Sequence, residues 1–130
     1  NVDGGFNQHN HYVLHRKGHT TSPHPWINVI ANHNFVFHVS AEGAIFTSAH
    51  NSRDYHLTPW TNDPVSNRPG EALYLVDLLS LKRFSPVSAV ECDDSVVYEA
   101  CHGFEFSTFK STHSDIALEL THALDRERTV

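Results

Sequence analysis

Short segments in which apolar and polar residues alternate recur along this chain, and they constrain its fold more than any other feature. The segment 35–39 places Phe35, Phe37 and Val39 at alternate positions, and the segment 115–121 has the same period. Because successive side chains of a strand point to opposite faces, such segments form strands with one apolar face. Gly, Pro, Asn and Asp lie between them, as is typical of turns. The pattern predicts an all-β fold, an antiparallel sheet or β-sandwich, with strands at 11–16, 27–31, 35–39, 44–47, 72–77, 96–100, 104–109 and 115–121.

A helix competes with a strand only near the end of the chain. In a helix over 118–128, Leu120 and Leu124 would lie on one side. The alternation up to Thr121 favours a strand that frays after His122, which is the interpretation we prefer. Neither a repeat nor a linker divides the 130 residues, a length that suits one domain. We therefore expect a single β-sandwich-like domain over residues 1–130.

Composition excludes several classes of protein. Eight Phe, four Tyr and two Trp are too many aromatic residues for a disordered segment. A formal charge of −6 opposes nucleic-acid binding, which needs a surplus of Lys and Arg. We find no apolar run of about 18 residues and no basic-then-apolar start, so neither a membrane span nor a signal peptide is expected. The sequence contains no Met, which suggests a fragment, a processed product or a partial clone.

Cysteine and histidine usage indicate neither a disulfide scaffold nor a cofactor site. Two cysteines, Cys92 and Cys101, predict reduced thiols in a cytoplasmic protein, although a bridge between them stays open. Twelve histidines are scattered, and three of them, His9, His11 and His15, would share one face of a strand. A specific metal site needs three or four convergent ligands, so we expect no bound metal and a surface whose charge changes near pH 6 to 7.

The loop 51–66 is rich in side chains that form hydrogen bonds. Sugars are bound by planar polar groups and by an aromatic face that stacks on the ring. The loop offers both kinds of group, and Trp26 offers a second aromatic platform, so the candidate carbohydrate-binding residues are Arg53, Trp60, Asn62, Asp63 and Trp26. A second interpretation stays open, in which Asn and Asp build turns, the indole anchors the loop and Arg53 pairs with Asp63.

Motifs along most of the chain resemble one known family. They read G-G-F at 4–6, P-W-I-N-V-I-A-N at 25–32, N-S-R at 51–53, L-T-P-W at 57–60, N-D-P-V-S at 62–66, P-G-E-A-L-Y-L at 69–75, H-G-F at 102–104 and I-A-L-E-L at 116–120. In this order they are similar to the amino-terminal β-sandwich domain of the disaccharide phosphorylases and cyclic β-1,2-glucan synthases, the cellobiose phosphorylase family or glycoside hydrolase family 94. The chain departs from that family at 32–37 and 44–48, where glycine and tryptophan are lost.

The resemblance implies a fold and a role. The fold would be the first half of a galactose mutarotase-like super-sandwich, and the family's catalytic acid would lie in a helical barrel that this chain lacks. We therefore expect a non-catalytic module that acts in assembly and binds a β-glucan oligosaccharide weakly. The alternative is a carbohydrate-binding subunit that completes a separate glycoside phosphorylase barrel. Carboxylates that a glycosidase would need are present at Glu42, Asp54, Asp63, Glu71 and Asp77, but no pattern brings two of them together.

Half a sandwich would leave apolar rows of Phe and Leu uncovered. Large apolar patches mark association surfaces, and two-fold dimers are the commonest oligomers. The sequence thus predicts either a rearranged small barrel or a homodimer that packs sheet on sheet, of which we favour the dimer.

Overall fold

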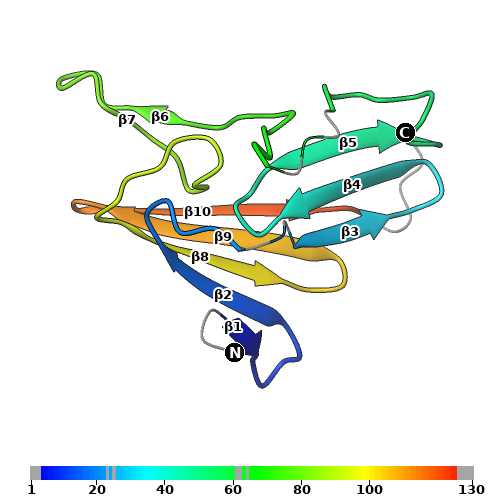
Figure 1. The fold of residues 1–130 in the computed structure, drawn as a ribbon, viewed down its shortest axis with the longest axis horizontal. Coiled ribbons are helices and arrows are strands. Elements are labelled where there is room, and N and C mark those ends of the chain that lie inside the picture. Colours follow the sequence, from blue (N-terminus) through cyan, green and yellow to red (C-terminus); the bar gives the residue numbers. More distant parts are fainter. Residues whose placement is uncertain (1–3, 23, 25, 61–62, 64, 126–130) are drawn as a thin grey trace.

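The structure, a computed structural model, describes residues 4–22, 24, 26–60, 63 and 65–125. Within these residues all the regular secondary structure is β, and every strand pair is antiparallel (Figure 1). The strands are β1 Gly4–Phe6, β2 Tyr12–Lys17, β3 Ile27–Ala31, β4 Phe35–Ser40, β5 Ile45–Ala49, β6 Leu75–Val76, β7 Arg83–Phe84, β8 Val97–His102, β9 Phe106–His113 and β10 Ile116–Ala123. The prediction of an all-β fold is confirmed.

Two main sheets face each other. One has the order β1-β2-β8-β9-β10, the other has the order β3-β4-β5, and β6 pairs with β7 in a separate hairpin. Tyr12 on β2 lies opposite His102 on β8, so the start of the chain joins a meander made from its end. Asn32 ends β3 and turns the chain toward β4, because its side-chain oxygen accepts the backbone N–H groups of Asn34 and Phe35.

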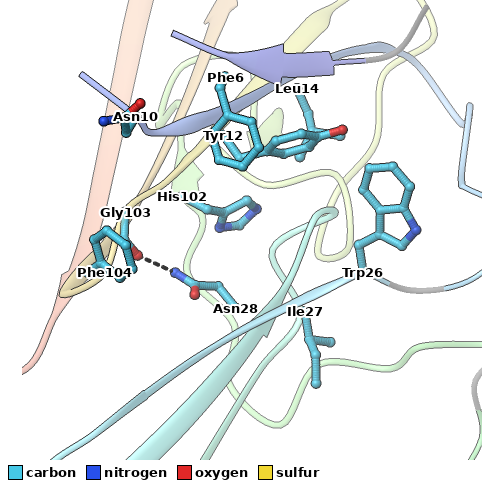
Figure 2. Close-up of a pocket in the computed structure, with 10 residues that line it drawn as sticks. All are labelled: Phe6, Asn10, Tyr12, Leu14, Trp26, Ile27, Asn28, His102, Gly103 and Phe104. Carbon is cyan, nitrogen blue, oxygen red and sulfur yellow. Dashed lines mark hydrogen bonds between the residues drawn. The ribbon is translucent and has the colours of Figure 1, made fainter. Parts of the chain in front are cut away.

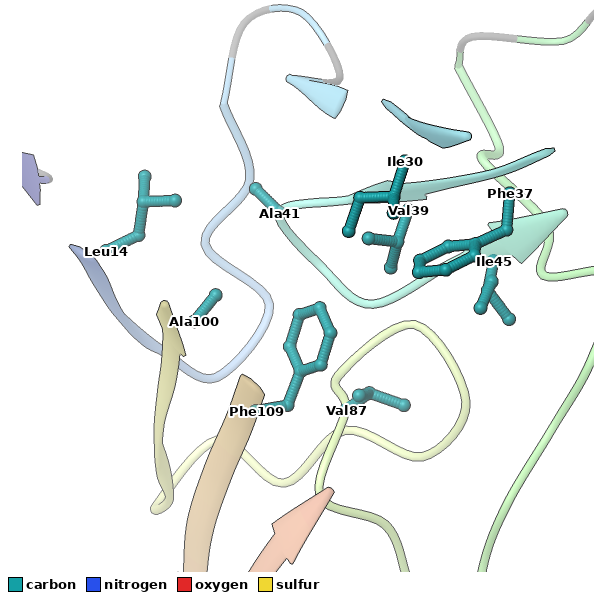
Figure 3. Close-up of a cluster of buried hydrophobic side chains, with 9 residues drawn as sticks. All are labelled: Leu14, Ile30, Phe37, Val39, Ala41, Ile45, Val87, Ala100 and Phe109. Carbon is teal, nitrogen blue, oxygen red and sulfur yellow. The ribbon is translucent and has the colours of Figure 1, made fainter. Parts of the chain in front are cut away.

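The core lies between the two sheets, and Figure 3 shows its side chains converging from both sides. The five-stranded sheet and the three-stranded sheet both contribute, and the loop before β8 adds one more residue. The core residues are Leu14, Ile30, Phe37, Val39, Ala41, Ile45, Val87, Ala100 and Phe109. This arrangement confirms the sandwich, since each sheet buries the inner face of the other.

The rows of Phe and Leu that half a sandwich would expose are therefore buried by other parts of the same chain. Phe37 and Val39 on β4 are buried beneath Phe109 and its neighbours, and Leu120 on β10 packs against the same core. The expectation that these rows form an open face is wrong, because both sheets of the sandwich come from this one chain. The exposed apolar residues lie elsewhere, and one group of them lies on the β6–β7 hairpin and the turn it contains.

Strand positions follow the alternation closely. β3 matches its predicted range, and β10 is a strand up to Ala123 rather than a helix. The predicted strand at 72–77 is reduced to the two residues of β6, and the strand predicted from Phe104 begins at Phe106. β1 and β7 were not predicted, because three and two residues are too few to show a period.

A buried ion pair joins β2 to the turn between β4 and β5. Arg16 Nη1 donates to Glu42 Oε1, and both residues are less than a tenth exposed. Asn67 completes the network, since its Nδ2 donates to Glu42 Oε2 at 3.2 Å and to Ser40 Oγ at 2.9 Å. In the same turn Gly43 has φ +87, and a Cβ there would meet Val87 at 2.4 Å, so the turn requires glycine.

Both cysteines are free thiols in the structure. Burial, together with the charges of Asp94 and Asp93, raises the pKa of Cys92, and burial raises that of Cys101. In the part of the chain that the structure describes, no three His, Cys, Asp or Glu side chains converge as metal ligands. None of the described residues forms a helix that could cross a bilayer.

Candidate aromatic binding site

A hollow of about 470 Å³ lies at one end of the sandwich (Figure 2). Its walls come from the β1–β2 hairpin, from β3 and the residue before it, and from the turn between β8 and β9. The lining residues are Phe6, Asn10, Tyr12, Leu14, Trp26, Ile27, Asn28, His102, Gly103 and Phe104. We call this space the aromatic hollow.

The wall of the aromatic hollow is apolar and open to solvent. Tyr12 anchors it, since its ring centroid lies 5.6 Å from that of Trp26 and 5.1 Å from that of Phe6. Trp26 is 41% exposed, so much of its indole is available to a ligand. Phe6 and Phe104 are still more exposed. Half-open aromatic rings of this kind present flat apolar platforms.

Hydrogen-bonding groups lie beside the aromatic wall. Asn28 Nδ2 donates to the backbone oxygen of Gly103 at 2.8 Å and to Ser107 Oγ at 3.1 Å, which ties β3 to the β8–β9 turn. His102 Nδ1 lies 2.9 Å from the same hydroxyl. Burial lowers the pKa of His102 to about 4, so its imidazole is neutral at pH 7. The hollow can thus stack on a ring and hydrogen-bond its edge.

Trp60 lies in a different, smaller hollow of about 140 Å³. Its ring is tilted by 36° against that of His56, with centroids 5.8 Å apart. His38 and Phe46 line the same hollow from the outer face of the three-stranded sheet. The lining residues of this hollow and of the aromatic hollow have no member in common. The structure therefore does not bring Trp26 and Trp60 into one site.

Arg53 and Asp63, two of the predicted loop residues, take part in turns. Arg53 is exposed, and its backbone N–H donates to Asn51 Oδ1 at 2.8 Å. Asp63 accepts from the backbone of Val65 and Ser66 and from the Ser66 hydroxyl, and these bonds lower its pKa. Among the described residues no ion pair joins Arg53 to Asp63. Asn62 lies outside the described residues.

The acidic side chains are engaged elsewhere. Glu42 pairs with Arg16, Glu71 accepts from the Thr47 hydroxyl at 2.8 Å, and Asp77 accepts from the Ser80 hydroxyl. Of the described residues around the aromatic hollow, none is Asp or Glu. The chemistry that the lining residues of this hollow offer is stacking and hydrogen bonding.

Of the ten residues that line the aromatic hollow, the sequence pointed only to Trp26. Tyr12, Asn28 and His102 come from three strands, and no local spacing links them. One signal was available for Asn28, because an amide inside the apolar run of β3 has to find buried partners. His9 and His11, which the sequence suggested as a pair, have ring centroids 6.0 Å apart, but His9 lies in a turn before β2 begins.

By comparison with known families, this antiparallel sandwich is a supersandwich domain. The family model for the glycosyl hydrolase 94 supersandwich domain matches residues 10–130, and the chain belongs to that family. It is similar to the cyclic beta-(1,2)-glucan synthase NdvB of Rhizobium meliloti (strain 1021), with 46% identity over 124 residues. That match covers 95% of this chain and 4% of the relative's length. The family resemblance found in the motifs is confirmed.

Proposed function

We propose that this domain is a non-catalytic module that binds a β-glucan oligosaccharide in the aromatic hollow. The observation that carries the proposal is the half-exposed indole of Trp26 beside Tyr12, with the polar groups of Asn28 and His102 close by. A pyranose has an apolar C–H face and a polar edge, and this pairing of a flat ring with hydrogen-bonding groups suits both. The relative's name supports a β-1,2-linked glucan as the ligand.

Binding is tested by tryptophan fluorescence with a linear β-1,2-glucooligosaccharide. Trp60→Phe leaves Trp26 as the reporter, and we expect this variant to bind the glucan as the wild type does. Because Trp26→Ala removes that reporter, its binding and that of the wild type are compared by titration calorimetry. We expect Trp26→Ala to bind at least about tenfold more weakly, because a central aromatic anchor contributes about 1–2 kcal/mol or more. Circular dichroism checks that both variants fold. Loss of binding in Trp60→Phe with retention in Trp26→Ala would move the site to the loop 51–60.

Assembly is a second candidate function, and the β6–β7 hairpin favours it. Seven apolar side chains between residues 73 and 81 are at least 41% exposed: Leu73, Tyr74, Leu75, Val76, Leu78, Leu79 and Leu81. The hairpin extends at the upper left of Figure 1, away from β3. It also carries an acid, Asp77, and two bases, Lys82 and Arg83, so two copies related by a two-fold axis can match opposite charges.

Light scattering after size exclusion tests this assembly. We expect a dimer mass at micromolar concentration, because an exposed apolar patch of this kind is stabilised by a second copy. Leu79→Asp, at a side chain that is 96% exposed, should give a monomer without loss of folding. Val65→Asp, at a residue that is 93% exposed on another loop, is the matched control and should keep the dimer. A wild-type monomer rules out this second function.

A further inference from the structure

The side-chain hydroxyl of Ser107 lies between Asn28 and His102, two residues that line the aromatic hollow. Ser107 is fully buried on β9, and its Oγ has two side-chain partners, Asn28 Nδ2 at 3.1 Å and His102 Nδ1 at 2.9 Å. A hydroxyl has one hydrogen to donate and two lone pairs that accept. The direction of each of these two hydrogen bonds can therefore be assigned.

The Asn28 amide has one orientation that satisfies its neighbours. Its nitrogen lies 2.8 Å from the backbone oxygen of Gly103 and 3.3 Å from that of Phe106, and a carbonyl oxygen only accepts. The nitrogen that faces Ser107 is therefore a donor, and Ser107 Oγ accepts from it. The hydroxyl hydrogen then has one acceptor among these contacts, Nδ1 of His102. A buried hydroxyl without an acceptor is costly, so Nδ1 carries no proton.

The other ring nitrogen of His102 then carries the proton of the neutral imidazole. Among the described residues Nε2 has no hydrogen-bond partner, and it is not one of the buried unsatisfied atoms, so it is accessible. Figure 2 shows the ring between Tyr12 and Asn28, within the hollow. Since burial keeps the pKa of His102 near 4, the neutral form is present at pH 7.

We propose that His102 is a specificity-determining residue of the aromatic hollow, where the Asn28–Ser107–His102 chain makes its Nε2–H a hydrogen-bond donor for a ring or hydroxyl oxygen of a pyranose. This proposal rests on the proposed glucan-binding function. A ligand that places an acceptor oxygen opposite Nε2 satisfies the donor. A ligand that places a C–H group there leaves the donor without a partner, and sites built to hydrogen-bond reject such analogues.

Nitrogen NMR of protein labelled at histidine measures the tautomer without any ligand. At pH 7 we expect the His102 spectrum to show a protonated Nε2 and an unprotonated Nδ1. Ser107→Ala removes the donor to Nδ1, so the ring should shift toward a mixture of both tautomers. A wild-type ring protonated at Nδ1, or at both nitrogens, overturns the assignment.

Two substitutions at His102 separate the donor from the rest of the ring. A glutamine amide reaches the place of Nε2, whereas an asparagine amide reaches only the place of Nδ1 and keeps the bond to Ser107. We expect His102→Asn to bind the β-1,2-glucooligosaccharide up to about tenfold more weakly, the effect of one lost hydrogen bond. His102→Gln should stay closer to the wild type.

The outcomes distinguish this inference from the function on which it rests. Equal binding by His102→Asn and the wild type overturns the donor role while glucan binding stands. A wild-type protein that binds no glucan overturns the proposed function and the ligand assigned to His102 together, and the nitrogen shifts then decide the tautomer independently.

Discussion

Urea unfolding of Glu42→Gln is expected to give a free energy of unfolding about 3–5 kcal/mol below that of the wild type. The substitution keeps the size of the side chain but removes the charge that pairs with Arg16, a residue only 7% exposed. A buried guanidinium without a counter-charge is unfavourable, and Asn67 loses a charged acceptor at the same time. Since domains are stable by about 5–15 kcal/mol, the loss is a large share of the total.

Glu119→Gln provides the matched control. Glu119 also forms an ion pair, with Lys110 at 3.2 Å, but both side chains are at least half exposed. Exposed ion pairs contribute little, so this variant should unfold at nearly the wild-type urea concentration. Equal urea midpoints for Glu42→Gln and Glu119→Gln would show that burial does not increase the contribution of the Arg16–Glu42 pair to stability.

Acidification from pH 6.5 to pH 4 is expected to destabilise the fold through its buried histidines. The unfolded chain binds a proton at each histidine near pH 6.5, whereas burial lowers the pKa of His102 to about 4 in the fold. The group therefore contributes full stability above pH 6.5, loses it as the pH falls and has no further effect below about pH 4. The difference between 6.5 and about 4 corresponds to about 3 kcal/mol for His102.

Other titratable groups change the stability of the fold over the same pH range or over a lower one. Burial also lowers the pKa of His38 and His122, so both residues add to the loss of stability as the pH falls below 6.5. At His102, Glu42 opposes the effect of burial and Arg16 adds to it. Asp63, Asp77 and Asp93, whose pKa values hydrogen bonds lower, lose their contribution at lower pH, as each is protonated in the fold.

Chemical unfolding at a series of pH values checks this prediction, with His102→Asn as the variant and His33→Asn as the control at an exposed histidine. The His102→Asn protein should lose much less stability than the wild type between pH 6.5 and pH 4. The His33→Asn protein should follow the wild type. Parallel curves for all three proteins would mean that His102 titrates normally in the fold.

The strands were predictable because local alternation encodes them. β4 and β10 show a period of two, β3 was predicted from its short apolar run, and the family motifs then indicated the supersandwich. The sequence did not reveal which strands from distant parts of the chain pack their side chains against each other. Nothing near Leu14 in the sequence shows that it packs in one core with Phe109.

The candidate site was only partly predictable for the same reason. Trp26 was identified as a platform, but its polar neighbours were not. Asn28 forms hydrogen bonds with residues 75 or more positions away, and His102 meets Ser107 across a pair of strands. Trp60 was grouped with Trp26 because each offers an aromatic face on which a sugar ring can stack. The fold separates them, since Trp60 covers the outer face of the three-stranded sheet while Asn28 reaches across to the other sheet.

The pairing of β2 with β8 has a consequence for how the chain folds. The meanders β3-β4-β5 and β8-β9-β10 join neighbours in sequence, so each forms from local contacts. β2 pairs across about 80 to 90 positions, from Lys17 with Val97 to Tyr12 with His102, and closing so long a loop makes folding slow. On a ribosome β2 can pair with β1 at once, but its other edge stays unpaired until β8 emerges. We therefore expect the Tyr12 side of the aromatic hollow to form last, when the amino-terminal hairpin docks on the completed meander.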